Sequence, residues 1–177
     1  FQMEEGGNQL LSDLGFVVIS FSYRGSTPLR GHDFYTHGYQ NLRDYALADD
    51  MTTIRQVARM IPQADTTRVG IYGHSGGGFM ATAALLTHPD FYRVAVAASG
   101  NHDNNIYLKW WGETFHGRGP IPTNMELAPR LEGRLLLIHG DMDNNVHPAS
   151  TLRMADALIR AGKRFDMLIL PGKDHGL

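Results

Sequence analysis

No cysteine occurs among the 177 residues of the chain. Disulfide bridges, thiolate zinc sites and a thiol nucleophile are therefore excluded, while a reducing and an oxidising compartment both stay open. A surplus of one charge is missing as well, because 16 lysines and arginines stand against 18 aspartates and glutamates. Since there is also no basic run, a nucleic-acid partner is not predicted.

Long apolar runs are also missing, so no membrane-spanning segment is predicted, and no signal peptide is visible. The sequence begins at Phe1 without an initiator methionine and stops shortly after His175. We therefore expect a fragment of a larger chain, and the missing targeting signals indicate little about location.

Apolar stretches rich in β-branched residues alternate along the chain with stretches of helical periodicity. Strands are predicted at 16–21, 69–72, 94–98, 135–138 and 165–170. Helices are predicted to end near Leu14 and to cover 41–61, 79–86, 104–115 and 148–161, with a long ordered loop over 26–38. Because the strands are continuously apolar and alternate with helices, the expected fold is α/β, a mostly parallel sheet with helices on both faces.

A glycine-rich turn with one serine, Gly73-His74-Ser75-Gly76-Gly77, follows the second expected strand. A serine hydroxyl attacks a carbonyl carbon only when it stands clear of the backbone and a base takes its proton. A sharp strand-to-helix turn exposes the hydroxyl, and it requires small residues two before and two after the serine, where Gly73 and Gly77 stand. The pattern alone is weak, but its position between a strand and a helix favours Ser75 as a nucleophile over an ordinary bend.

An acid and a base are expected on later loops, because reactive groups collect at the carboxyl ends of parallel strands. Asp141 and Asp143 follow the strand at 135–138, and His175 follows the strand at 165–170. Either aspartate could orient a histidine, and turn formation or helix capping is the simpler interpretation of each alone. The order serine, acid, histidine is the one that the α/β-hydrolase fold imposes, so together they predict a catalytic triad.

Metal and cofactor chemistry find little support in the sequence. There is no H-E-x-x-H motif, and His139 with the nearby aspartates lacks a third ligand at a suitable spacing. No Lys-Ser/Thr pair follows the glycines after Ser75, so a phosphate loop is not predicted either. His74 is expected to pack beside the site rather than to act as the base. We predict neither a metal nor a cofactor.

Three stretches of the sequence resemble one known family. They run from Asp65 to Ser75, from Leu137 to His147 and from Asp174 to Gly176. These motifs are similar to those of the prolyl oligopeptidase family of serine peptidases, in particular its dipeptidyl peptidase IV-like branch, and the resemblance covers nearly the whole chain. It implies that residues 1–177 are a partial α/β-hydrolase catalytic domain, truncated at both ends, with a β-propeller upstream in the full-length chain.

The resemblance assigns roles to individual residues of the expected site. Ser75 matches the nucleophile, Asp143 rather than Asp141 matches the triad acid, and His175 matches the general base. The N–H of Gly76 matches an oxyanion donor. The implied reaction is the hydrolysis of peptide bonds in oligopeptides through an acyl-enzyme. A carboxylesterase and a non-catalytic binding module of the same fold are the alternatives.

Substrate contacts are implied by the resemblance as well. Asn145 matches an asparagine that holds a substrate carbonyl, and Val146 matches the neighbouring apolar wall. Tyr107 and Trp111 fall where relatives place aromatic residues around a pocket for a proline-like ring, although core packing is an equally good interpretation of both. Relatives commonly carry tyrosine where this chain has Gly76, so a wider or differently filled pocket is expected.

Partners and location follow only from the family. The resemblance implies a peptide substrate, allows a homodimer of the full-length chain, and favours a periplasmic or secreted location over the cytoplasm. The sequence itself leaves location, oligomeric state and residue preference open.

We predict that the isolated 177-residue chain is inactive or nearly so. In relatives the second oxyanion donor lies on a loop before the first helix, which this stretch does not contain, and one such donor contributes on the order of 3 kcal/mol. Assays with peptide amides and short-chain esters check this, and robust turnover of either by the isolated chain would contradict it.

Overall fold

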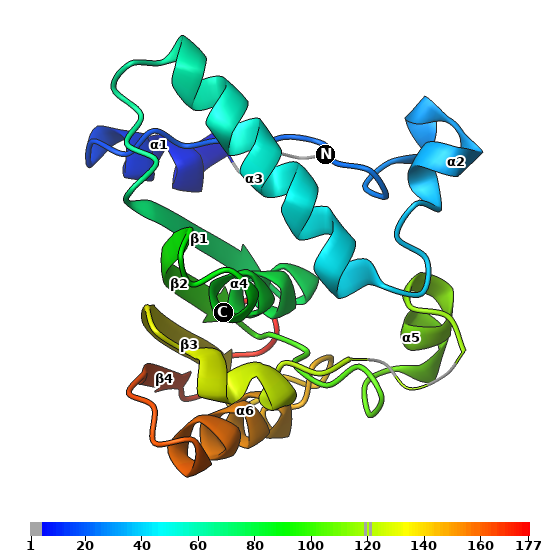
Figure 1. The fold of residues 1–177 in the computed structure, drawn as a ribbon. Helices are drawn as coiled ribbons and strands as arrows, with labels where there is room; N and C mark the ends of the chain where they lie inside the picture. The colour runs from blue at the N-terminus through cyan, green and yellow to red at the C-terminus, as the bar shows by residue number, and fades with distance from the viewer. Residues whose placement is uncertain (1–4, 119, 121) are drawn as a thin grey trace.

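Four parallel strands form one sheet in the computed structural model, which describes residues 5–118, 120 and 122–177 (Figure 1). The strands lie side by side in chain order, and they are β1 (Val69–His74), β2 (Tyr92–Ala98), β3 (Arg134–Gly140) and β4 (Asp166–Leu170). The helices are α1 (Glu5–Asp13), α2 (His32–Tyr35), α3 (Leu42–Met60), α4 (Gly76–Thr87), α5 (Lys109–Phe115) and α6 (Ala149–Arg160), with short 3-10 helices η1 (Pro28–Arg30) and η2 (Met125–Arg130). The predicted α/β fold with a parallel sheet is confirmed.

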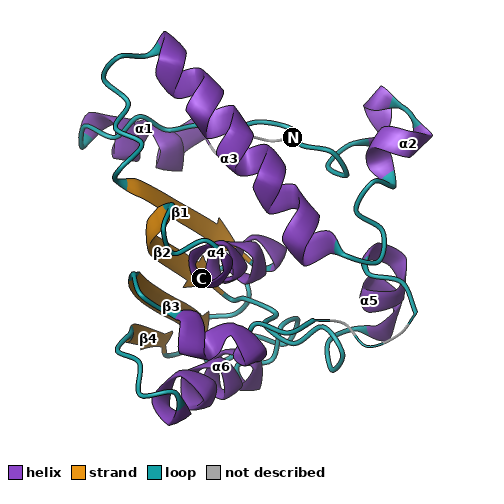
Figure 2. Ribbon diagram, viewed as in Figure 1, coloured by secondary structure: helices purple, strands orange, loops and turns teal. Residues whose placement is uncertain are grey.

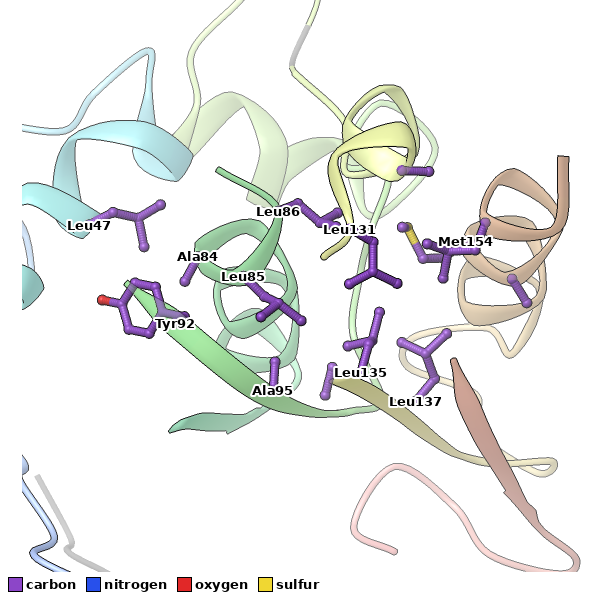
Figure 3. Packing of buried hydrophobic residues seen from close by; sticks show 14 of the residues in the cluster. Leu47, Ala84, Leu85, Leu86, Tyr92, Ala95, Leu131, Leu135, Leu137 and Met154 are labelled. Carbon is purple, nitrogen blue, oxygen red and sulfur yellow. The ribbon is translucent and has the colours of Figure 1, made fainter. Parts of the chain in front are cut away.

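One face of the sheet carries the hydrophobic core. Because side chains alternate along a strand, Ala95 of β2 and Leu135 and Leu137 of β3 point to the same side, where all three are buried. Leu85 of α4 and Met154 of α6 pack onto them from above (Figure 3). Figure 2 shows α4 and α6 in front of the strands. These two helices therefore close the main core.

The opposite face of the sheet is more open. Tyr72 of β1 is 54% exposed and Val94 of β2 is 43% exposed. The hydroxyl of Tyr72 donates a hydrogen bond to the side-chain carbonyl of Asn8 in α1. Among the described residues, helices therefore cover the core face extensively, while α1 contacts the other face at β1.

The long helix α3 begins and ends where its sequence predicts. The side chain of Asn41 accepts a hydrogen bond from the N–H of Asp44, which caps the first turn, and Pro62 follows the last turn at Met60. Leu47 on its inner side is fully buried in the core (Figure 3). No helix in the described part of the chain combines the length and apolarity needed to cross a membrane.

The sequence predictions fail mainly before α3. Residues 16–21 form no strand, because they do not pair with the outer edge of β1, where the described sheet begins, and a strand needs a ladder of hydrogen bonds. Residues 26–38 contain η1 and α2 rather than a plain loop. The helix predicted over 104–115 starts only at Lys109, because the Asp103 carboxylate accepts the N–H of Asn105 and forms a turn instead. The other predicted elements are confirmed with shifted ends.

A sharp turn centred on Ser75 links β1 to α4. Ser75 has φ 58° and ψ −122°, a conformation that non-glycine residues rarely adopt and that costs about 1–3 kcal/mol. Its N–H donates to the carbonyl of Ala98 at 2.8 Å, which ties the turn to β2. Strand and helix approach so closely here that a Cβ at position 73 would lie 2.3 Å from the carbonyl oxygen of Gly77. A Cβ at Gly78 would lie 2.6 Å from the Ala98 carbonyl, so α4 also packs directly on β2.

We predict that Gly73→Ala lowers the free energy of unfolding by about 1–3 kcal/mol, because the added methyl group must displace backbone atoms. Gly77→Ala is the matched control. A Cβ at Gly77 meets nothing within 4 Å, so the structure does not require the small residue expected there, and the helix propensity of alanine raises stability by up to about 1 kcal/mol. Urea unfolding of both variants measures the difference, and equal midpoints would contradict the close approach.

Candidate active site

Three side chains from three loops converge at the carboxyl end of the sheet. The hydroxyl oxygen of Ser75 lies 3.0 Å from Nε2 of His175. Nδ1 of the same ring lies 2.8 Å from Oδ2 of Asp143. The loops follow β1, β3 and β4, so the parallel sheet delivers all three groups to one edge. The structure thus brings together the three residues that the sequence selects, while their catalytic roles stay predictions.

The turn geometry leaves the Ser75 hydroxyl available to the histidine. Ser75 occupies the N-cap position of α4, yet its side chain makes no capping hydrogen bond. Gly76 is the first residue of α4, and the first N–H groups of a helix have no acceptor within it. The positive end of the helix dipole adds to the attraction of negative charge at this point. An oxyanion next to Ser75 would meet both.

The carboxylate of Asp143 is fully buried and is surrounded by hydrogen-bond donors. Its Oδ1 accepts the backbone N–H groups of Asn145 and Val146, each at 2.9 Å. Its Oδ2 accepts from His175 at 2.8 Å and from Nε2 of His139 at 3.1 Å. Burial, the largest single influence, raises the pKa of Asp143, but the hydrogen bonds from His175, Asn145 and Val146 together bring that pKa below its ordinary value. The group is therefore an anion held in place on both oxygens.

His139 belongs to this site, although its sequence context suggested only a possible metal ligand. Its side chain is fully buried on β3, four residues before Asp143. Its Nε2 lies 2.8 Å from the carbonyl oxygen of Val146, and its Nδ1 lies 2.6 Å from the hydroxyl of Thr151 on α6. A histidine directly after a predicted strand, close before a candidate acid, was the available signal. Within the described residues, no cluster of three or more metal-ligating side chains forms around it.

Two contacts hold the loop that carries the histidine. Nε2–H of His74 donates to the backbone carbonyl of His175 at 2.6 Å, and the two rings lie 4.6 Å apart between centroids. The side chain of Asp141 accepts the N–H of Gly172 at 2.6 Å. Asp141 therefore supports the turn after β4, while Asp143 contacts the His175 ring. The geometry thus selects Asp143 as the partner of the histidine, a choice that the residues alone left open.

Gly140 at the end of β3 lets the same loop lie against the strand. A Cβ there would stand 2.3 Å from the carbonyl oxygen of Lys173. With glycine at position 140, the same Lys173 carbonyl is close enough to accept the N–H of Met142 at 2.9 Å. Backbone contact between the acid loop and the histidine loop therefore sets their spacing.

Of the four residues expected to contact substrate, Tyr107, Asn145 and Trp111 form a connected group, and Val146 lies apart from it. The hydroxyl of Tyr107 donates to Oδ1 of Asn145 at 2.7 Å, and its ring meets Trp111 with centroids 5.6 Å apart. A Cβ at Gly76 would lie 3.6 Å from Cζ2 of Trp111, so this indole stands beside the nucleophile turn. Neither aromatic residue belongs to the hydrophobic core cluster. Val146 differs from the expectation of an apolar wall, because it is 1% exposed and serves the site through its backbone.

Known proteins are similar to this chain in sequence and in fold. Residues 4–177 match the model of the prolyl oligopeptidase family. Dipeptidyl peptidase 8 of Mus musculus and that of Homo sapiens are each 32% identical over 177 aligned residues, which cover 94% of this chain and 20% of theirs. The chain therefore spans about a fifth of the length of these curated relatives.

Solved structures agree with these matches. A protein of Bacteroides ovatus, assigned as a dipeptidyl aminopeptidase IV, superposes with a TM-score of 0.80 at 29% identity, over 88% of this chain and 23% of its own. Dipeptidyl peptidase 4 of Porphyromonas gingivalis superposes with a TM-score of 0.77 at 26% identity, over 86% of this chain and 22% of its own. The match to the family model extends over nearly the whole chain, and the resemblance expected from the sequence is confirmed: this protein belongs to the prolyl oligopeptidase family.

Proposed function

We propose that the full-length protein is a serine peptidase that cleaves oligopeptides in the manner of a dipeptidyl peptidase. Ser75 attacks the scissile carbonyl carbon while His175 takes its proton. His175 then protonates the leaving amine. Water attacks the acyl-enzyme while His175 takes its proton, and His175 gives that proton to the Ser75 oxygen as the acid product leaves. Asp143 orients the ring and stabilises its charged form. The continuous hydrogen-bonded line from Ser75 through His175 to Asp143 is the observation that carries this proposal.

The oxyanion of the tetrahedral intermediate is proposed to bind at the start of α4. The N–H of Gly76 is adjacent to the nucleophile and has no acceptor in the helix. A donor of this kind contributes on the order of 3 kcal/mol, because it meets charge that develops only in the transition state. Helix α4 thus serves both the attacking oxygen and the oxygen that becomes charged.

We propose that Asn145 presents its amide N–H₂ to a substrate carbonyl. Its Oδ1 is already engaged by the Tyr107 hydroxyl, and this fixes which end of the amide faces the site. Tyr107 and Trp111 are proposed to flank a small ring-bearing residue of the substrate, next to the space that Gly76 leaves free. The names of the relatives, dipeptidyl peptidases, support a peptide as the occupant.

Three further features are proposed for the full-length protein: an upstream β-propeller, a homodimer, and a periplasmic or secreted location. The chain covers 20% of the length of its curated relatives, so a β-propeller upstream in the full-length protein is compatible with their size. A homodimer and a periplasmic or secreted location are proposed from the family resemblance alone. Size-exclusion chromatography and cell fractionation of the full-length protein address these two points.

The proposed reaction is tested on the full-length protein with Xaa-Pro and Xaa-Ala amides beside short-chain esters. We predict cleavage of the dipeptide amides, and a loss of at least about a thousandfold in kcat for Ser75→Ala. Turnover of esters without peptides would favour a carboxylesterase. No turnover of any substrate, together with no reaction with a serine-directed phosphonate, would favour a binding module.

The pocket is tested by Trp111→Ala, with the neighbouring Trp110→Ala as a matched control. Trp111 stands beside Gly76, whereas Trp110 is 62% exposed. Losing the apolar contact of an indole with a proline-like ring raises KM for Xaa-Pro amides by about tenfold or more, while Trp110→Ala leaves KM within about twofold. Equal KM values in the two variants would remove Trp111 from the pocket.

A further inference from the structure

We infer that His139 is a positioning residue for the proposed reaction, because it supplies a second imidazole N–H to the carboxylate of Asp143 and so holds that group in line with His175. The inference rests on the proposed function, since it concerns the same site. His139 does not reach Ser75 in any contact of the structure. It acts through the acid and not on the substrate.

The contacts of His139 determine where its proton lies. Nε2 faces two acceptors, the Val146 carbonyl at 2.8 Å and Oδ2 of Asp143 at 3.1 Å. Neither acceptor can donate, so Nε2 must carry the hydrogen. In the neutral tautomer with this hydrogen, Nδ1 carries the lone pair and accepts the hydroxyl hydrogen of Thr151 at 2.6 Å. Thr151 thereby fixes the tautomer in which the ring donates toward the acid.

The position of Thr151 makes this arrangement rigid. Thr151 lies in the first turn of α6 and is fully buried, as are His139 and the side chain of Asp143. A buried hydroxyl and a buried ring without partners would each be destabilising, so the three groups keep one hydrogen-bonded arrangement. Helix α6, which packs over the core, is thereby connected to the acid loop.

Two titratable side chains that interact with His139 or Asp143, those of His102 and Tyr107, add no charge beside them. His102 is fully buried, and burial lowers its pKa to about 3, so it is neutral at working pH. Burial and the negative charge of Asp143 raise the pKa of Tyr107, so that phenol also stays neutral. His175 is the only other ring that donates to the carboxylate in the described residues. Without His139, Oδ2 keeps one donor and the carboxylate can rotate away from His175.

The test compares Thr151→Val, Thr151→Ser and His139→Gln in the full-length protein. Valine keeps the shape of threonine but removes the hydroxyl, whereas serine keeps the hydroxyl. Thr82→Val is the matched control, because Thr82 is equally buried and its hydroxyl has no partner. The readouts are the rate constant for phosphonylation of Ser75, the fraction of sites that react, and kcat and KM for the cleaved peptide.

We expect Thr151→Val and His139→Gln to lower the phosphonylation rate constant and kcat by about tenfold or more, with KM within about twofold. Thr151→Ser restores both to within about threefold, and Thr82→Val leaves both unchanged. Should His139→Gln not fold, the Thr151 pair still decides the question.

Three results would overturn the inference: unchanged rate constants in Thr151→Val, a fall only in the fraction of reactive sites, or a rise in KM at constant kcat.

Phosphonylation of Ser75 tests the role of His139 separately from the proposed peptidase function. A wild-type protein that is phosphonylated but cleaves no peptide would refute the peptidase, and the Thr151 comparison would still decide the role of His139. A wild-type protein that is not phosphonylated would overturn both.

Discussion

A carboxylate that is buried away from solvent needs hydrogen-bond donors to stabilise its negative charge, and Asp143 has four N–H groups that do so. Two come from the backbone of its own loop, one from β3 through His139, and one from the loop after β4 through His175. Removing any one leaves the buried charge with fewer hydrogen bonds to stabilise it. The carboxylate therefore fixes the relative position of the segments that carry the proposed chemistry, and the orientation of His175 toward Ser75 follows from it.

Glycines give the backbone the close approaches that this arrangement needs. Gly73 and Gly78 bring α4 against β1 and β2, and Gly140 brings the histidine loop against β3, in each case at distances that exclude a side chain. The strain at Ser75 is retained because the turn is held from both sides, by Ala98 and by the start of α4. Backbone packing thus places the nucleophile, and side-chain hydrogen bonding places the base. The nucleophile and the base meet at the hydrogen bond between Ser75 and His175.

Much of this site is predictable because a parallel sheet gathers the loops after its strands at one edge. Loop position and order were enough to select Ser75 and His175, but the residues alone could not choose between Asp141 and Asp143, since both lie on the same loop. That choice depends on tertiary hydrogen bonds, as does the link from His139 to Thr151 on a later helix. The strand expected at 16–21 failed for the same reason, because pairing depends on a neighbour that local sequence does not encode.

The central claim, that the anion at Asp143 activates Ser75, is tested most directly by mapping a serine-directed phosphonate adduct in Asp143→Asn and Asp141→Asn full-length proteins. Asparagine at 141 keeps the carbonyl that accepts the N–H of Gly172, whereas asparagine at 143 removes the charge beside His175. The predicted result is an adduct on Ser75 in wild type and Asp141→Asn, with the reaction slowed by about 10⁴-fold in Asp143→Asn. Equal rates in the two variants, or an adduct on a different serine, would contradict the claim.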